Sequence, residues 1–335
     1  MGGSYSQPAQ VKDVHFPAFK AALPRLESKV IAITGTTSGT GYVAAQTCAE
    51  LGAQVLLLNR PSERATASLE SLRKAVPSGK FEAVACDLQD LASVRAAAKE
   101  VNAKCPNGLD VLCNNAGVMA LADVSTKDGF DVQMQTNVIA PFLLTSLVMP
   151  SLERAAARAG EARVVMHSSI ARYGKDLEAK YFEKGMAGKL GGDGNSMLFG
   201  GGRWVRYQQT KTADIVLTYA LGDRLAAKGS KVITCVAHPG LAATNLQVTT
   251  TQQGGMSGTA LVMKLSQSQR DGSMGIIRGI AGKPVANKSF FGPTGGQSAM
   301  YGKAELLPHE PKFDSAKNKD TLWAACEKAV GPFFP

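Results

Sequence analysis

The chain has 335 residues, of which 44% are hydrophobic and 19% are charged, and its formal net charge at pH 7 is +10. This composition is that of a globular protein and excludes a disordered chain, and the length allows one large domain or two of ordinary size. Lys and Arg are spread along the chain without interleaved aromatic residues, which argues against a nucleic-acid partner. The positive charge instead favours anionic ligands such as a nucleotide phosphate, or an anionic membrane surface.

The sequence indicates an intracellular protein that is soluble or peripherally bound to a membrane. It has no apolar run of the roughly 18 residues that span a bilayer, and its N-terminus lacks the apolar core of a signal peptide. Gly2 followed by Ser6 fits the N-myristoylation pattern, and a single acyl chain would bind a membrane only reversibly. The cysteines and histidines lack metal-ligand spacing, so we expect no metal site. Free thiols in a reducing compartment are predicted for Cys48, Cys86, Cys105, Cys113, Cys235 and Cys326.

Residues 1–27 are expected to form an irregular lead-in, because Pro8, Pro17 and Pro24 interrupt them. Residues 28–335 are expected to form a single domain in which short apolar strands alternate with helices. Strands are predicted at 29–35, 53–60, 80–88, 109–117, 162–169 and 231–240, and helices at 42–51, about 63–74 and about 94–101. This alternation predicts an α/β fold of the Rossmann type, a doubly wound parallel sheet with helices on both faces.

Two segments interrupt the alternation, and the chain continues past the last of these strands as a C-terminal extension. Residues 172–206 are rich in glycine, and residues 247–284 are polar and dotted with glycine, with one apolar patch at 260–265. Long segments of this kind in a compact domain are either functional loops or disordered surface. We favour an active-site lid for the first segment and a substrate loop for the second.

Gly35, Gly39 and Gly41 lie between the first predicted strand and the first predicted helix, in the spacing GxxxGxG. Glycines at this junction allow a tight turn and let backbone N–H groups approach a pyrophosphate at the N-terminus of the helix. Three glycines in a loop are a weak signal alone, and their position after a buried strand strengthens it. The turn therefore predicts a dinucleotide site.

Four further motifs follow the glycine turn in order. They are "NNAG" (114–117), the pair Ser168 and Ser169, Tyr207 with Lys211 four positions later, and "HPG" (238–240). Together the five motifs resemble the short-chain dehydrogenase/reductase superfamily over about residues 28–245. The later stretches "SFFGPTG" and "LWAACEKAVG" look like the retinol dehydrogenase branch of that family.

The resemblance assigns the chemistry to four side chains. Tyr207 matches the general acid/base, Ser169 (or the adjacent Ser168) matches the residue that hydrogen-bonds the substrate oxygen, and Asn137 matches the asparagine that supports a water in the proton relay. A free phenol has a pKa near 10, so it needs a favourable neighbour to work near neutral pH. The Lys211 ammonium, one helical turn away, favours the phenolate, and in the family this lysine also holds the nicotinamide ribose.

The end of the second predicted strand bears on the choice of cofactor. NAD-dependent enzymes place Asp or Glu there for the ribose 2′-hydroxyl, whereas this chain has Asn59 followed by Arg60. A guanidinium pairs with a 2′-phosphate that a carboxylate would repel, so we expect NADP(H), with Thr37 or Ser38 also near the phosphate. If Arg60 instead points to solvent, either cofactor would bind. The resemblance implies further cofactor contacts at Gly35, Gly39, Thr40, Gly41, Asp87, Leu88, Asn114, Ala116, Gly117, Tyr207, Lys211, Pro239, Gly240 and Thr244.

These features predict an NADP(H)-dependent oxidoreductase that transfers a hydride between the nicotinamide and a carbonyl or alcohol. A bulky apolar substrate, such as a retinoid, lipid or quinone, would be covered by apolar residues of the glycine-rich segment, namely Met186, Met197, Leu198, Phe199 and Trp204. Two alternatives stay open. The chain could be a catalytically silent accessory subunit with a dehydrogenase fold. It could also be a light-dependent protochlorophyllide-type reductase, because Tyr207 follows Ser169 at a longer separation than is usual in the family. The sequence also leaves open whether the chain forms a homo-oligomer.

Overall fold

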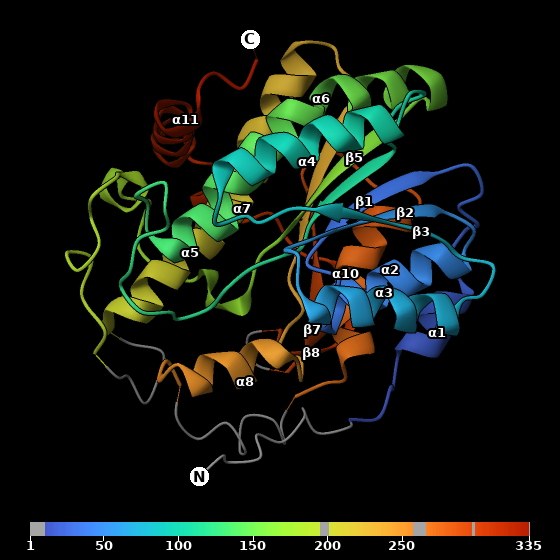
Figure 1. Cartoon of the computed structure of the whole chain (residues 1–335), viewed down its shortest axis with the longest axis horizontal. Coiled ribbons are helices and arrows are strands. Elements are labelled where there is room, and N and C mark those ends of the chain that lie inside the picture. The colour runs from blue at the N-terminus through green and yellow to red at the C-terminus, as the bar shows by residue number, and fades with distance from the viewer. Residues whose placement is uncertain (1–10, 195–200, 257–265, 297–298, 335) are drawn as a thin grey trace.

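The computed structural model describes residues 11–194, 201–256, 266–296 and 299–334. Its centre is one eight-stranded sheet with strand order β3-β2-β1-β4-β5-β6-β7-β8 (Figure 1). The strands are β1 (Val30–Thr34), β2 (Gln54–Asn59), β3 (Lys80–Ala85), β4 (Val111–Asn114), β5 (Ala162–His167), β6 (Val232–Ala237), β7 (Ser289–Gly295) and β8 (Tyr301–Leu306). Strands β1 to β7 are parallel, and β8 pairs antiparallel with β7 at one edge. The predicted doubly wound α/β fold is confirmed.

Helices cover both faces of the sheet (Figure 1). They are α1 (Phe16–Ala21), α2 (Gly39–Glu50), α3 (Glu63–Ala75), α4 (Leu91–Lys104), α5 (Val132–Met134), α6 (Ala140–Ala159), α7 (Gly201–Ala227), α8 (Asn245–Gln252), α10 (Gln269–Ala281) and α11 (Ala316–Val330). Short 3₁₀ helices lie at Ile170–Arg172, Ala179–Phe182 and Pro311–Asp314, and a π-helical turn lies at Gln135–Ile139.

The apolar strands build two cores, because neighbouring residues of a strand point to opposite faces. On β1, Ala32 enters the core shared with α4, α6, α7 and α11. Its neighbours Ile31 and Ile33 enter the core shared with α2 and α10. Both cores are continuous because the central strands are buried on both faces.

The strand order reverses between β1 and β4, so the chain segments that leave these two strands diverge at the same edge of the sheet. In open α/β sheets, a ligand site forms at such a switch point, outside the carboxyl ends of the strands. The glycine turn follows β1 and the "NNAG" motif follows β4. The topology therefore brings the two predicted nucleotide motifs together.

The lead-in is not entirely irregular, because it contains helix α1. The backbone N–H groups of Val14, His15 and Phe16 donate to the carboxylate of Asp271 at 2.8–2.9 Å, so a side chain of α10 satisfies the start of α1. Phe16 is buried in the core beneath α10. A contact from a residue about 255 positions away cannot be read from the local sequence.

The prediction of a loop over 247–284 is wrong for its second half, which forms the buried helix α10. Glycines of α10 let the helix lie close to the sheet: a Cβ at Gly272 would approach the Cβ of Ala242 to 2.5 Å, and one at Gly279 would approach the Sγ of Cys235 to 3.0 Å. The missing side chains of these glycines allow close packing of the helix. In the sequence alone, the same glycines are typical of a loop, which is why the helix was not predicted. The first part of the segment contains α8, and the apolar patch at 260–265 lies outside the described residues.

The predicted lid, residues 172–206, is largely packed against the protein. Leu177, Tyr181 and Phe182 belong to the main core, and Leu190 joins them. The segment also contributes the first residues of α7, which begins at Gly201. The described part of the segment is therefore irregular apart from the 3₁₀ turn Ala179–Phe182 and the start of α7, and its role as a lid stays a prediction.

Helix α6 continues the short helical segments before it, and the stretch Val132–Ala159 is long and apolar enough to cross a membrane by length and composition. The most apolar window of this stretch is 72% buried inside the protein. A helix of a protein core has the same property, and the stretch supplies core residues such as Phe142 and Leu144.

Candidate active site

The glycine turn after β1 has the backbone shape that only glycine adopts readily. Gly35 and Gly39 have φ angles of 72° and 63°. A Cβ at Gly35 would come within 2.8 Å of the Cα of Ala116, so this turn and the segment after β4 touch. Asn59 holds the turn: its Oδ1 accepts from the Thr36 N–H at 2.8 Å and its Nδ2 donates to the Thr36 hydroxyl at 2.8 Å.

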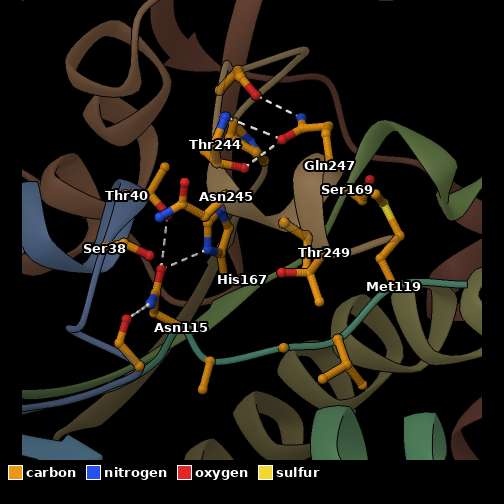
Figure 2. A pocket seen from close by; sticks show the side chains of 18 of the residues that line it. Ser38, Thr40, Asn115, Met119, His167, Ser169, Thr244, Asn245, Gln247 and Thr249 are labelled. Atoms are coloured by element: carbon orange, nitrogen blue, oxygen red, sulfur yellow. Dashed lines mark hydrogen bonds between the residues drawn. The ribbon is translucent and has the colours of Figure 1, made fainter. Parts of the chain in front are cut away.

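Asn115 links the two nucleotide motifs to β5 (Figure 2). Its Nδ2 donates to the carbonyls of Thr34 and Gly35, so its Oδ1 is the acceptor for the Thr40 hydroxyl at 3.0 Å and for His167 Nδ1 at 2.9 Å. His167 must therefore carry its proton on Nδ1, which leaves Nε2 as an acceptor. Nε2 is buried and has no hydrogen-bond partner among the described residues. Burial lowers the pKa of this imidazole to about 3, which keeps it neutral.

A cavity of about 390 Å³ opens where these segments meet. It is lined by Gly35, Thr37, Ser38, Gly39, Thr40, Arg60, Ala116, Gly117, Ser169, Tyr207, Lys211, Pro239, Gly240 and Thr244, all of them predicted from the sequence. Residues that were not predicted also line it, among them Arg64, Asn115, Met119, His167, Asn245, Leu246 and Met256. Figure 2 shows side chains from both groups around the same space.

Tyr207 and Lys211 are both buried on α7 and line the cavity. The Lys211 Nζ lies 5.8 Å from the centre of the Tyr207 ring and donates to the backbone carbonyl of His167 at 2.8 Å. Ser169 also lines the cavity and lies near enough to the phenol to lower its pKa. The Ser168 hydroxyl donates to the Lys211 carbonyl at 2.7 Å, so it serves the backbone of α7 and Ser169 is the serine available to a substrate.

The pKa of Tyr207 lies above its ordinary value because burial disfavours the phenolate more than Lys211 and Ser169 favour it. Burial alone would lower the pKa of Lys211, but the neighbouring Asp214 carboxylate and the Tyr207 phenol raise it, so the amine stays protonated. The Lys211 ammonium therefore favours the phenolate and burial opposes it, while the catalytic role of the pair stays a prediction.

Asn137 lies in the π-helical turn Gln135–Ile139, an irregularity that often marks a functional site. Its side chain pairs with the backbone of Val118 in both directions, at 2.8 and 2.9 Å, and donates to the Thr210 hydroxyl at 2.9 Å. Asn137 therefore fastens the segment after β4 to α7 directly beside the cavity. Its predicted role in a water relay stays a prediction.

One side of the cavity is apolar. Met119 and Trp204 pack with Tyr207, and Leu246 and Met256 complete this side. The Trp204 ring lies edge-on to the Tyr207 ring with 5.8 Å between the ring centres, and its indole N–H donates to the Gly255 carbonyl at 2.9 Å. Among the described residues of the glycine-rich segment, Trp204 is the one that lines the cavity.

Residues 29–181 match the family model of the short chain dehydrogenases. A short-chain dehydrogenase/reductase from Armillaria gallica is 34% identical over 228 residues, which cover 67% of this chain and 69% of the relative. The chain belongs to the short-chain dehydrogenase family.

Relatives of this short-chain dehydrogenase place it in the retinol dehydrogenase-like branch. A polyprenol dehydrogenase from Danio rerio is 31% identical over 67% of this chain, and the match spans 65% of that protein's own length. Among solved structures, an uncharacterized protein from Mycobacterium paratuberculosis superposes with a TM-score of 0.72 and 29% identity, covering 94% of this chain and 98% of the other.

Some residues predicted to contact the cofactor of this short-chain dehydrogenase lie elsewhere in the described structure. Asn114 is buried and donates to the Thr145 hydroxyl at 3.0 Å, and its neighbour Asn115 reaches the cavity instead. Asp87 accepts from the Gln89 N–H, which shapes the loop after β3. Outside the described lining of the cavity are Gly41, Asn59, Asp87, Leu88, Asn114 and Asn137. For Asp87 and Leu88, an adenine contact stays a prediction.

The expectation of an apolar cover is met in part. Met186 packs against the main core and is absent from the described lining of the cavity. Met197, Leu198 and Phe199 lie outside the described residues, as do Gly2 and Ser6. All six cysteines are buried free thiols, and the described residues contain no cluster of three potential metal ligands.

Residues missed by the sequence analysis had weak signals. Arg64 lies in the first turn of α3, four positions after Arg60, and its guanidinium approaches the Ser38 hydroxyl at 3.4 Å. That spacing could have indicated a second cation at the same end of the site. Asn115 and His167 could not be recognised from the spacing of residues in the sequence, because their contacts join β1, β4 and β5, which are far apart along the chain.

Proposed function

We propose that this short-chain dehydrogenase is an NADP(H)-dependent oxidoreductase for a bulky, apolar alcohol or carbonyl compound. The observation that carries the proposal is the placement of Tyr207, Ser169 and Lys211 in one cavity that has cationic side chains at one end and an apolar side at the other. Each part of the cavity corresponds to one part of such a reaction.

The residues of the cavity fit a dinucleotide. The glycine turn exposes backbone N–H groups at the N-terminus of α2, where a pyrophosphate is stabilised. The unpartnered Nε2 of His167 offers an acceptor for a ribose hydroxyl, and Gly117 leaves space beside the Lys211 ammonium. Arg60 and Arg64, both exposed at the cavity rim, suit a 2′-phosphate. NADP(H), when bound, would supply or accept the hydride.

The protein's own groups would handle the proton and the substrate. Tyr207 would donate its phenolic proton to the substrate oxygen in reduction, or accept one in oxidation, while Ser169 hydrogen-bonds the same oxygen. The Lys211 ammonium stabilises the phenolate electrostatically. Met119 and Trp204 exclude water from this point, which strengthens each of these interactions.

The apolar side of the cavity supports an apolar substrate. The name of the polyprenol dehydrogenase relative refers to a long isoprenoid alcohol, a compound that such a surface would accommodate. A carbonyl or hydroxyl at the end of an apolar chain could reach Tyr207 while the chain lies against Leu246 and Met256.

The experiment that tests the proposal combines binding and turnover on one purified sample. NADPH and NADH are titrated by fluorescence, and nicotinamide absorbance is then followed with isoprenoid aldehydes and alcohols of increasing length and with matched short polar compounds. We expect NADPH to bind more tightly and turnover to increase with chain length. Binding without turnover of any compound would favour the accessory-subunit alternative, and no binding of either cofactor would overturn the proposal.

Arg60→Ala should weaken NADPH binding by about 10- to 100-fold, because it removes a charge-assisted hydrogen bond to the 2′-phosphate. NADH lacks this phosphate, so its affinity should change little. The matched control is Arg73→Ala, which removes an exposed cation of α3 that is outside the described cavity lining. Equal losses for NADPH and NADH in Arg60→Ala would contradict the assignment.

A further inference from the structure

Asp214 lies one helical turn beyond Lys211 on α7 and is 1% exposed. Its Oδ2 accepts a hydrogen bond from the Lys211 Nζ at 2.8 Å. Its other oxygen, Oδ1, is buried and has no hydrogen-bond partner among the described residues. Within the described structure, the hydrogen-bond partner of this carboxylate is therefore Lys211, the lysine of the proposed reaction.

The Lys211 ammonium has three N–H bonds, and two of them are occupied. One donates to the His167 carbonyl and one to Asp214, both at 2.8 Å. These two acceptors come from β5 and α7, so they define the position of Nζ. The third N–H is available to a ligand in the cavity that Lys211 lines. Gly117 lies on this side: a Cβ at Gly117 would be 3.6 Å from Nζ.

The charges around Lys211 come from few groups. Helix α7 presents Tyr207 and Asp214, and β5 presents His167, which burial keeps neutral. The π-helical turn presents Asn137, and the segment after β4 presents Asn115, Ala116 and Gly117, none of which is charged. Asp214 is therefore the anion that acts on the Lys211–Tyr207 pair within the described structure.

Asp214 and Lys211 have opposite effects on the pKa of Tyr207: Lys211 lowers it and Asp214 raises it. The ammonium stabilises the phenolate, whereas the carboxylate disfavours it and holds the proton on Lys211. With Asp214 ionised, loss of a proton from the Lys211–Tyr207 pair leaves a net negative charge in a buried site. Without that charge, the same proton loss leaves the site neutral and becomes easier.

We propose that Asp214 is a positioning residue that holds the Lys211 ammonium and partly offsets its charge, and that it thereby sets the pH range in which Tyr207 exchanges its proton. The inference rests on the proposed function, because it requires turnover. A purely structural role, neutralising a buried lysine for stability, would predict a loss of stability and no change in the pH dependence of turnover.

The test is Asp214→Asn, which keeps the shape and an oxygen acceptor for Lys211 and removes the charge. The kcat/KM for oxidation of an isoprenoid alcohol is measured from pH 6 to pH 10, and NADPH binding is titrated on the same sample. We expect the rising limb of the profile to move to lower pH by about one unit or more. If this variant does not fold, Asp214→Ser removes the same charge with a smaller side chain and should give the same shift.

The matched control is Asp110→Asn. Asp110 is also buried and also paired with cations, Lys29 and Arg158, both at 2.9 Å. It precedes β4, at the amino ends of the parallel strands, whereas the cavity lies at their carboxyl ends. Its substitution should therefore affect stability without shifting the rising limb of the pH profile.

An unmoved limb in Asp214→Asn, a limb moved to higher pH, or an equal shift in Asp110→Asn would overturn the inference. Failure of the proposed function is distinguishable from these results, because the unmodified chain would then show no turnover at any pH. Binding of NADPH by Asp214→Asn together with the acidic shift would support it.

Discussion

Tyr207→Phe should lower kcat by about 10² to 10⁴-fold while leaving NADPH affinity in place. The substitution removes only the hydroxyl, so the ring can keep its edge-on contact with Trp204 and the cavity should keep its shape. The rate falls because the variant has no phenolic proton to transfer, and in the described structure this phenol is the acidic group whose pKa both Lys211 and Ser169 lower. Stopped-flow absorbance after mixing the NADPH complex with an isoprenoid aldehyde measures the step directly.

Tyr219→Phe is the matched control for this prediction. Tyr219 lies on the same helix, is 1% exposed, and burial raises the pKa of its phenol to about 12. It is not among the described residues that line the cavity, so turnover should be unchanged. Normal activity in Tyr207→Phe would remove Tyr207 from the reaction and would require another group to transfer the proton.

Arg206→Met should lower the free energy of unfolding by about 3–5 kcal/mol at pH 8, the cost of leaving buried charges without a partner. Arg206 precedes Tyr207 on α7 and is fully buried. Its guanidinium pairs with Asp131 at 3.2 Å and with Asp123 at 3.5 Å. It also donates to the carbonyls of Leu121, Leu190 and Gly192 at 2.9–3.2 Å. One cation therefore joins α7 to the segment after β4 and to the glycine-rich segment.

The cost of Arg206→Met should be smaller at pH 5 than at pH 8. Burial raises the pKa of Asp131 to about 6 in the folded protein, and Arg206 opposes this rise. A carboxyl with a raised folded pKa favours folding when it is protonated, and this contribution is lost as the pH rises through the folded pKa. Without Arg206 the pKa of Asp131 rises further, so at pH 5 the carboxyl is neutral and needs no cation.

Urea unfolding followed by tryptophan fluorescence at the two pH values measures this difference. The control is Arg270→Met, which removes an arginine paired with Asp13 at 3.2 Å on the surface and should cost less than about 1 kcal/mol at either pH. A cost for Arg206→Met that is small, or that is the same at pH 5 and pH 8, would show that the buried charges are satisfied in another way.

The strands and the nucleotide motifs could be predicted because their signals are local. A run such as Val30–Thr34 is apolar throughout, which is typical of a parallel strand with helices on both faces. Gly35 and Gly39 occupy left-handed φ values, so their spacing in the sequence carries the shape of the turn. Even here the helix α2 begins at Gly39, three residues before the predicted start, because the glycine turn forms the first turn of the helix.

Helices α1 and α10 could not be predicted, because the reasons for them are distant in the sequence. Asp271 on α10 satisfies the start of α1, and glycines of α10 are needed where the helix packs closely against residues such as Ala242 and Cys235. In a local window these residues are indistinguishable from those of a polar loop. The packing of the glycine-rich segment could not be predicted for the same reason, since Arg206 of the following helix donates to the carbonyls of Leu190 and Gly192.

The order of the strands, the glycine turn and the choice of Tyr207, Lys211 and Ser169 as candidate residues can be predicted from the amino-acid sequence, because each has a short, recognisable pattern around it. The neighbours of these residues depend on how distant segments pack together. Asn115 rather than Asn114 reaches the cavity, His167 keeps a free acceptor there, and Asp214 occupies one bond of the Lys211 ammonium. Burial, which arises when the whole chain folds, determines how strongly those neighbours act on the proton of Tyr207.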